Sequence, residues 1–183
     1  MSHADKKRGL VVGDVQSGKT SNYLGLLSKA ADAGYKVIFI LTGTIESLRK
    51  QTQQRVEEGF VGFDSVEGID VGVGRGIKMP KAFTSRAKDF TGGDNQNTTY
   101  KISDYSSEPM IFVVKKNVPV LKKIYSSLKQ INTSNEHQKI NYSMLMIVLY
   151  PQSYFEIKAD NYYILLLSVK NNVTERYRKC IPD

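Results

Sequence analysis

The sequence predicts an α/β fold with a mainly parallel sheet flanked by helices. Two observations lead to this prediction. Short apolar runs, typical of strands covered on both faces, alternate with segments that have the apolar spacing of helices. All 14 glycines lie between residues 9 and 93, which concentrates turns and close backbone approaches in the first half of the chain. The strands are expected at residues 9–13, 37–41, 110–114 and 144–149.

The first helix is expected over residues 20–33, after the first strand. Leu24, Leu27 and Ala31 recur at the spacing of one helix side. Gly34 follows the periodic segment and is expected to end the helix, because glycine readily adopts the left-handed conformation that is common at this position.

Two more helices are expected from their end signals. One runs from residue 45 to about residue 58, with Thr44 as its N-terminal cap and Gly59 as its end. The other begins after Asn117, which can cap it, and has Pro119 at an early position, where proline is well tolerated.

The segment from residue 62 to residue 105 has no regular pattern. It is rich in Gly, Asp, Asn, Thr and Lys, and we expect one strand within it, at residues 69–73. We interpret it as an irregular insert or loop region within a lobe that covers residues 1–147.

Residues 148–183 differ in composition from the lobe. They contain no glycine, and Lys, Asn, Ile, Tyr, Phe and Leu together fill 19 of the 36 positions. We therefore treat this segment as an atypical C-terminal tail.

Charge and composition narrow the classes of partner. The chain has 26 basic and 18 acidic residues, a net charge of +8, which suits a polyanion such as DNA. The single cysteine, Cys180, excludes an intrachain disulfide and fits a reducing compartment. No apolar run approaches the ~18 residues of a membrane span. We expect a cytoplasmic protein without a membrane partner.

One motif points directly to a ligand. Residues 13–20 read G-D-V-Q-S-G-K-T and match the phosphate-binding pattern G-x-x-x-x-G-K-[ST] in full, between an expected strand and an expected helix. Backbone N–H groups of such a loop can surround phosphates because no side chain obstructs them. The candidate nucleotide-binding residues are Gly13, Asp14, Gln16, Ser17, Gly18, Lys19 and Thr20.

Lys19 and Thr20 are the candidate catalytic residues of this loop. Lys19 is expected to reach the β- and γ-phosphates, and the Thr20 hydroxyl is expected to ligate Mg²⁺. We therefore expect ATP and Mg²⁺ as ligands. Hydrolysis usually also needs an acidic residue after a neighbouring strand, but the strand at residues 144–149 runs into Tyr150, and the nearest acid is Glu156. The sequence thus predicts a nucleotide binder with weak or absent hydrolysis.

The segments 9–23, 29–38, 42–52 and 72–76 closely resemble the N-terminal ATPase part of bacterial proteins that carry the Z-one endonuclease domain. That family is similar to superfamily-two helicases and is associated with restriction and anti-phage defence. The resemblance covers residues 1–147 and implies a RecA-like P-loop lobe of a DNA-associated, restriction-type ATPase. It also implies other subunits of a restriction or defence system as partners.

The resemblance implies positions that would meet a nucleic-acid strand. They follow two of the expected strands and are Thr42, Gly43, Thr44 and Arg49 in one group, and Lys115, Lys116 and Asn117 in the other. The first group lies where such helicases contact nucleic acid, and the second ends the strand at residues 110–114.

The sequence departs from the family after the strand at residues 144–149. In the family pattern, the strand segment at residues 144–147 runs straight into an Asp-Asp-Glu-Ala-Asp type motif. Here it runs into Val148, Leu149 and Tyr150, and the only similar stretch comes about ten residues later, at residues 158–161. Our hypothesis is that the reading frame changes near Ile147, which would leave a truncated lobe, incomplete at its C-terminus. The alternative is an ordinary divergent C-terminal segment, in which Glu156 and Asp160 are the candidates for the missing magnesium ligands.

Two other function classes stay open on the sequence. A small P-loop kinase would need a general base and an acceptor pocket, for which the sequence shows no pair of residues with useful spacing. A non-catalytic nucleic-acid or partner-binding module could use basic residues around two aromatic rings in the irregular region, and a solvated loop is the alternative there. These residues are Lys78, Lys81, Arg86, Lys88, Phe83 and Phe90.

The histidines predict no zinc site. Neither His3 nor His137 has zinc-ligand spacing to another histidine or to cysteine.

Overall fold

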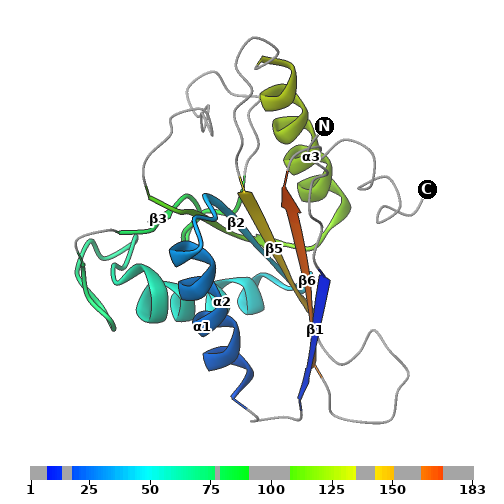
Figure 1. Ribbon diagram of the computed structural model, residues 1–183. Helices are drawn as coiled ribbons and strands as arrows, with labels where there is room; N and C mark the ends of the chain where they lie inside the picture. The colour runs from blue at the N-terminus through cyan, green and yellow to red at the C-terminus, as the bar shows by residue number, and fades with distance from the viewer. Residues whose placement is uncertain are drawn as a thin grey trace.

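The computed structural model describes residues 8–13, 18–76, 79–90, 108–134, 143–150 and 162–170. Figure 1 shows one sheet with helices around it. The strands are β1 (Arg8–Gly13), β2 (Val37–Thr42), β3 (Lys81–Ala82), β4 (Met110–Lys115), β5 (Ser143–Tyr150) and β6 (Tyr162–Lys170). The helices are α1 (Lys19–Asp32), α2 (Glu46–Val56), the π-helix η1 (Glu57–Val61) and α3 (Val118–Ser134).

The six strands form a sheet in the order β1-β6-β5-β2-β4-β3. β2 is parallel to both β4 and β5, and β3 is parallel to β4. β6 is antiparallel to both of its neighbours, β1 and β5, so β1 runs in the same direction as β5. Within the described residues, β6 is therefore the one reversed strand, and the predicted α/β fold with a mainly parallel sheet is confirmed.

Each of the four apolar segments forms a strand close to its expected bounds. β2 and its neighbours form the centre of the sheet, and β2 is buried along its whole length. β5 continues through residue 147 to Tyr150, and β6 comes from the segment that the sequence sets apart as a tail. The reading frame of that segment is a property of the DNA and stays a prediction.

Alternate residues of the central strands pack on opposite faces of the sheet. On one face, Phe39 and Phe112 belong to a cluster with Val120 and Ile124 of α3. The other face contacts α1 and the α2–η1 segment. It contains Ile38, Ile40, Ile111, Val113 and Ile147, with Tyr23, Leu27, Ala30, Val56 and Val61 packed against them. The result is a three-layer arrangement with helices on both faces, as parallel strands require.

α1 begins and ends close to the expected positions, and α3 begins where it is expected. Gly34 has a φ of 85°, and the backbone N–H groups of Gly34 and Tyr35 bond back to the last turn of α1. At α3, the Asn117 side chain accepts a hydrogen bond from the Val120 N–H at 3.0 Å. Both end signals are therefore confirmed.

The expected ends of the second helix are wrong. Ile45 holds the N-cap position, and no side chain caps α2. The helix does not stop at Gly59, because it continues as η1 to Val61, and Gly62, with a φ of 75°, ends it. Gly59 has a different purpose: an added Cβ would lie 2.5 Å from Cδ1 of Leu24, so glycine lets η1 pack closely against α1.

The described part of the irregular region wraps around the end of η1. The expected strand at residues 69–73 is wrong, since this segment shows an isolated bridge between Phe63 and Asp70 followed by a turn. The Val73 N–H bonds to the Glu58 carbonyl at 2.8 Å, which holds the loop against the helix. Residues 91–105 of the expected insert lie outside the described part.

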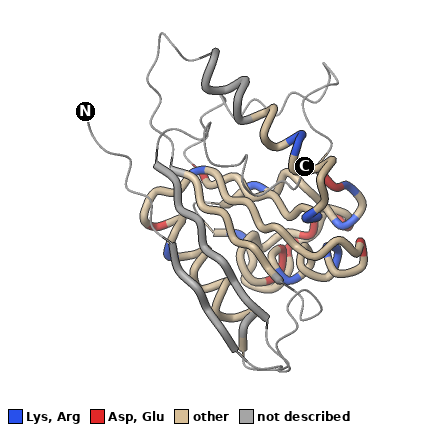
Figure 2. Tube along the Cα trace, turned by 90° about the vertical axis from the view of Figure 1, so that its right-hand side faces the viewer, with Lys and Arg blue, Asp and Glu red and all other residues tan. Residues whose placement is uncertain are grey.

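Most charged residues of the described part lie on helices and loops, and few lie on the strands of the sheet. Figure 2 shows acidic and basic positions mainly on the helices and loops, with the central strands almost uncharged. In β2, β4 and the apolar centre of β5, Lys115 at the end of β4 is the one charged residue. In the described ranges, no helix is long and apolar enough to cross a membrane.

Candidate functional site

The phosphate-binding motif joins β1 to α1. β1 ends at Gly13, and α1 begins at Lys19, so the motif leaves the carboxyl end of a strand and enters a helix N-terminus. Gly18 has a φ of 73°, which favours glycine, although an added Cβ would meet nothing within 4 Å. Asp14, Gln16 and Ser17 lie outside the described residues, as does the side chain of Lys19.

The N-terminus of α1 suits an anion. Its first turn holds no acidic residue, and no side chain caps it. The Asn22 N–H makes the first helical hydrogen bond, to the Gly18 carbonyl at 3.0 Å. The N–H groups before it have no acceptor within the helix, and they carry the positive end of the helix dipole. These features fit the phosphate groups that the motif predicts.

Arg55 of α2 reaches the same helix turn from the neighbouring helix. Its Nη1 donates a hydrogen bond to the Thr20 hydroxyl at 3.4 Å. Tyr23 of α1 lies close to both residues. Burial raises the pKa of its phenol to about 12, and the Arg55 charge and the hydrogen bond with Thr20 lower it by less. Arg55 lies beside the candidate site, and sequence reasoning missed it because a single arginine far from the motif carries no signal of its own.

A second polar cluster lies where β2 and β4 end. The edge cluster, as we call it, consists of Arg49, Glu46, Lys115 and Asp89. Arg49 is fully buried and bonds to Glu46 Oε1 through Nε at 3.0 Å and Nη2 at 2.7 Å. Lys115 Nζ lies 2.9 Å from Glu46 Oε2 and 3.5 Å from Asp89 Oδ2. The ion pairs raise the pKa of Lys115.

Arg49 also holds the chain around residue 85. Its Nη1 donates to the Ser85 carbonyl at 2.8 Å, and its Nη2 donates to the Arg86 carbonyl at 3.1 Å. This buried guanidinium makes four hydrogen bonds within the protein, which does not suit a residue that touches a nucleic-acid strand. Its role in the structure is to join α2 to the irregular segment.

The other positions that the resemblance implies come together at one edge of the sheet. Because β2 and β4 are parallel neighbours, Lys116 follows β4 beside Thr42, and its N–H bonds to the Thr42 carbonyl at 3.1 Å. The Thr42 hydroxyl is buried and donates to the Val114 carbonyl at 3.1 Å. Gly43 is half-buried, Thr44 is exposed, and Asn117 caps α3. The structure thus brings the two groups together and uses most of these side chains internally.

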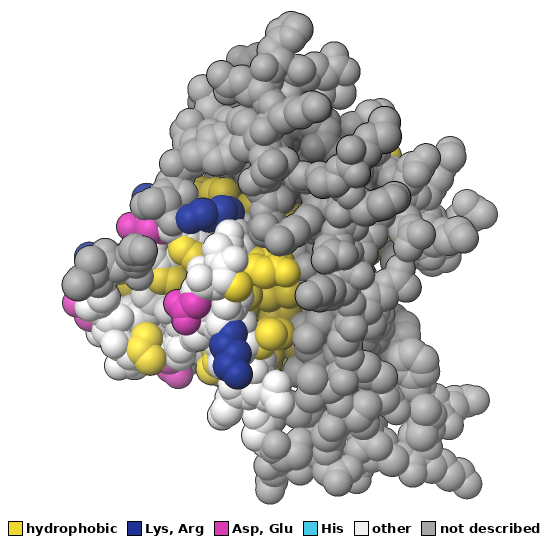
Figure 3. All heavy atoms as spheres, viewed as in Figure 1, with side chains coloured by type: hydrophobic (Ala, Val, Ile, Leu, Met, Phe, Trp, Pro, Cys, Tyr) yellow, Lys and Arg dark blue, Asp and Glu magenta, His cyan; other side chains and the backbone are white. Residues whose placement is uncertain are grey.

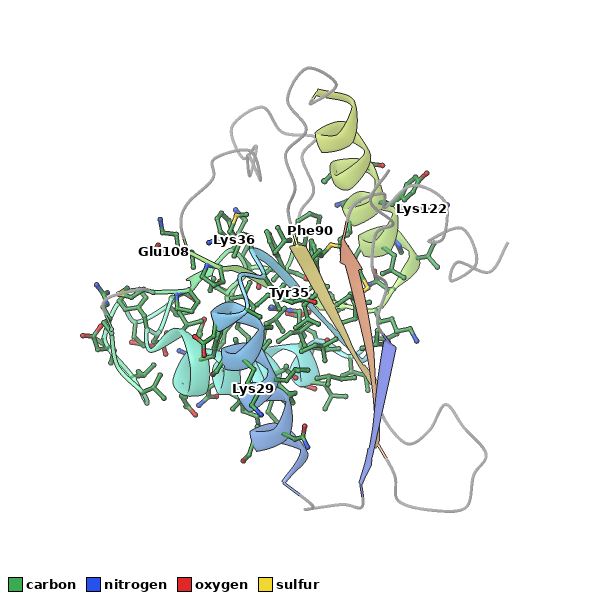
Figure 4. All side chains as sticks on the ribbon, viewed as in Figure 1. Lys29, Tyr35, Lys36, Phe90, Glu108 and Lys122 are labelled. Atoms are coloured by element: carbon green, nitrogen blue, oxygen red, sulfur yellow. The ribbon has the colours of Figure 1, made fainter. Side chains whose placement is uncertain are left out.

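The two aromatic rings of the open nucleic-acid alternative lie against the core and not in a solvated loop. Phe90 is buried in the cluster that contacts α3, and Phe83 stacks on Phe112 with ring centroids 5.2 Å apart. Figure 4 shows Phe90 beside the sheet, whereas Lys122 projects outward from α3. Phe90 is buried and Phe83 is partly buried, both against the core cluster that includes β4, so Phe90 offers no ring face to a base.

The basic residues around these rings are partly paired. Lys81 lies 3.4 Å from Glu108, and Arg86 pairs with Asp64 and with the buried Glu57. Lys78 lies outside the described residues. On the face in Figure 3, basic side chains of the described residues are scattered among apolar, acidic and uncharged ones. The described residues therefore form no continuous basic patch on this face.

Acid should destabilise the protein through two paired carboxylates. The hydrogen bond from Arg49, with help from Lys115, lowers the pKa of Glu46 to about 2, and the hydrogen bond from Arg86 lowers that of Asp64 to about 2. Unfolded carboxyls titrate near pH 4. The stabilisation is therefore present above about pH 4 and is lost as the pH falls from about 4 through 2.

Urea unfolding at several pH values tests this expectation. Asp64→Asn should lower the urea midpoint at pH 6, and the difference from the unaltered chain should shrink towards pH 2. Asp32→Asn, at an exposed position at the end of α1, is the control and should change the midpoint little. A difference for Asp64→Asn that stays constant from pH 6 to pH 2 would contradict the assignment.

The structure describes no candidate metal centre made of side chains alone. Among the residues searched, no group of three His, Cys, Asp or Glu side chains could hold an ion. Glu156 and Asp160 lie outside the described residues, as do His3, His137 and Cys180.

Comparisons with known proteins leave the family open. No family model, curated protein or solved structure matches the chain. The resemblance to the Z-one endonuclease family therefore stays a prediction from the quoted segments.

Proposed function

We propose that the chain is a RecA-like ATP-binding lobe of a DNA-associated, helicase-like ATPase of the restriction type. The observation that carries the proposal is the complete phosphate-binding motif at residues 13–20, which joins a strand end to an uncapped helix N-terminus. The resemblance to the Z-one family and the net charge of +8 support the DNA-associated role. They also support partners from a restriction or defence system.

The ligand that suits these residues is ATP with Mg²⁺. Lys19 would hold the β- and γ-phosphates as a point charge, together with the N–H groups at the start of α1. The Thr20 hydroxyl, half-buried in the first turn, would ligate the metal. Bound Mg²⁺ neutralises charge on the phosphate oxygens.

Weak or absent hydrolysis is part of the proposal. β6 separates β1 from β5, so the ends of β1 and β5 are about 10 Å apart, at the usual strand spacing. No acidic residue directly follows β5 in the sequence. The carboxylates described at this edge, Glu46 and Asp89, are paired with Lys115. These features favour a site that binds ATP but lacks a carboxylate to position the attacking water.

Calorimetric titration with Mg²⁺–ATP tests the site. Lys19→Ala should weaken ATP binding by about tenfold or more, because it removes a charge-assisted contact to the phosphates. Lys50→Ala removes the same charge from an exposed position on α2 and should leave the affinity unchanged. An ATP affinity that Lys19→Ala does not alter would show that the loop is not the nucleotide site.

A further inference from the structure

We propose that Arg55 is a nucleotide-contacting residue, whose guanidinium binds the terminal phosphate of a nucleotide held by the loop at residues 13–20. The inference rests on the proposed function and adds a residue from a second helix. The phosphate-binding motif, residues 13–20, does not predict this residue.

The packing of two helices places Arg55 beside the motif. Its Nη1 lies 3.4 Å from Oγ1 of Thr20, in the first turn of α1. One turn further along each helix, Gly59 lies directly against Leu24. α1 therefore meets the α2–η1 segment at two places, Arg55 beside Thr20 and Gly59 beside Leu24. The close approach of Gly59 to Leu24 holds the two helices together near Arg55, which places Arg55 within reach of the first turn of α1.

Arg55 differs from the other arginines in its partner. Arg49, Arg75 and Arg86 each form an ion pair with a carboxylate, namely Glu46, Asp70 and Asp64. Among the arginines whose side chains the structure describes, Arg55 alone contacts a neutral hydroxyl instead of a carboxylate. Its side chain is exposed, so the guanidinium keeps donors for an anion from solution.

The surroundings of Arg55 favour phosphate as that anion. The first turn of α1 contains no acidic residue and presents unbonded N–H groups, and Lys19 lies in the same turn. A planar guanidinium can bind two phosphate oxygens at once, which a point charge cannot do. The charges gathered here are thus complementary to a polyphosphate and have no carboxylate to neutralise them within the described first turn.

The contact with Thr20 points to the terminal phosphate in particular. The Thr20 hydroxyl would hold Mg²⁺, which would supply charge neutralisation at the β- and γ-phosphates. A guanidinium repels Mg²⁺, so Arg55 needs another acceptor once the metal takes the Thr20 hydroxyl. Phosphate oxygens of the same nucleotide supply it. Arg55 should therefore contribute more to binding ATP than to binding ADP.

Titration of the full chain with ATP and with ADP, both with Mg²⁺, tests this inference. Arg55→Ala should weaken ATP binding by about tenfold or more, as expected for a lost charge-assisted hydrogen bond, and ADP binding by less than about threefold. Lys50→Ala, on the same helix, is the matched control for net charge and should bind both nucleotides as the unaltered chain does. Thermal unfolding of each variant checks that the fold is retained.

The outcomes separate this inference from the proposed function. If the unaltered chain binds no ATP, both are overturned. If it binds ATP and Arg55→Ala changes nothing, only the role of Arg55 is overturned. Equal losses for ATP and ADP in a folded Arg55→Ala variant would also overturn it, because a purely structural effect on the loop would weaken both nucleotides alike.

Discussion

Gly62→Ala is expected to lower the free energy of unfolding by about 3 kcal/mol, through backbone strain and overpacking together. Gly62 has a φ of 75°, a left-handed conformation that alanine rarely adopts. An added Cβ would lie 1.8 Å from the Gly74 carbonyl oxygen, so the loop at residues 72–74 would have to move away. That movement would break the bond from the Val71 N–H to the Gly62 carbonyl, which is 3.1 Å long.

Gly68→Ala is the matched control for this prediction. Gly68 has a similar φ, 72°, but an added Cβ would meet nothing within 4 Å. Gly68→Ala should therefore lower the free energy of unfolding only by the conformational strain, about 1 kcal/mol. Urea unfolding of both variants measures the difference, and equal losses would show that the close approach of Gly62 to Gly74 does not matter for stability.

Arg49→Met is expected to destabilise the chain by about 3–5 kcal/mol, the usual cost of breaking a buried charged network. Methionine has a similar length but no donor. The carbonyl groups of Ser85 and Arg86 would lose their bonds to Arg49, and Glu46 would keep only Lys115 as a partner. Each buried polar group without a partner costs about 1–3 kcal/mol.

Guanidinium unfolding compares Arg49→Met with Lys50→Met. Lys50 is the exposed neighbour of Arg49 on α2, and its replacement should change stability by no more than about 0.5 kcal/mol. Amide hydrogen exchange should also speed up around residues 85–90 in Arg49→Met alone. A loss below about 1 kcal/mol would mean that Arg49 does not hold the irregular segment.

The centre of the sheet could be predicted because its signal is local. β2, β4 and β5 are continuous apolar runs, and such runs are typical of strands buried on both faces. The end of α1 and the start of α3 were predictable for a similar reason. A left-handed glycine after a helix and an asparagine cap before one act within a few residues of the helix terminus.

The parts that sequence reasoning missed depend on contacts between distant segments. Gly59 resembles a helix stop, but its partner Leu24 on α1 decides its role. Arg49 resembles a surface arginine until the chain at residues 85–86 closes over it. At the candidate site, the motif residues were visible in the sequence, whereas Arg55 was not, because helix packing alone brings it to Thr20.

The position of β6 has a consequence for the order in which the chain folds during synthesis. β1 is paired in the sheet with β6, from Arg8 opposite Leu167 to Gly13 opposite Tyr162. β2, β4 and β5 can associate on the ribosome as soon as residue 150 has emerged, whereas β1 must wait for β6 before it gains its neighbour. Pairings so distant in sequence form slowly. Of the described strands, the one that leads into the phosphate-binding loop is made first and docks last, so a nascent chain should acquire its nucleotide site only after residue 170 has emerged.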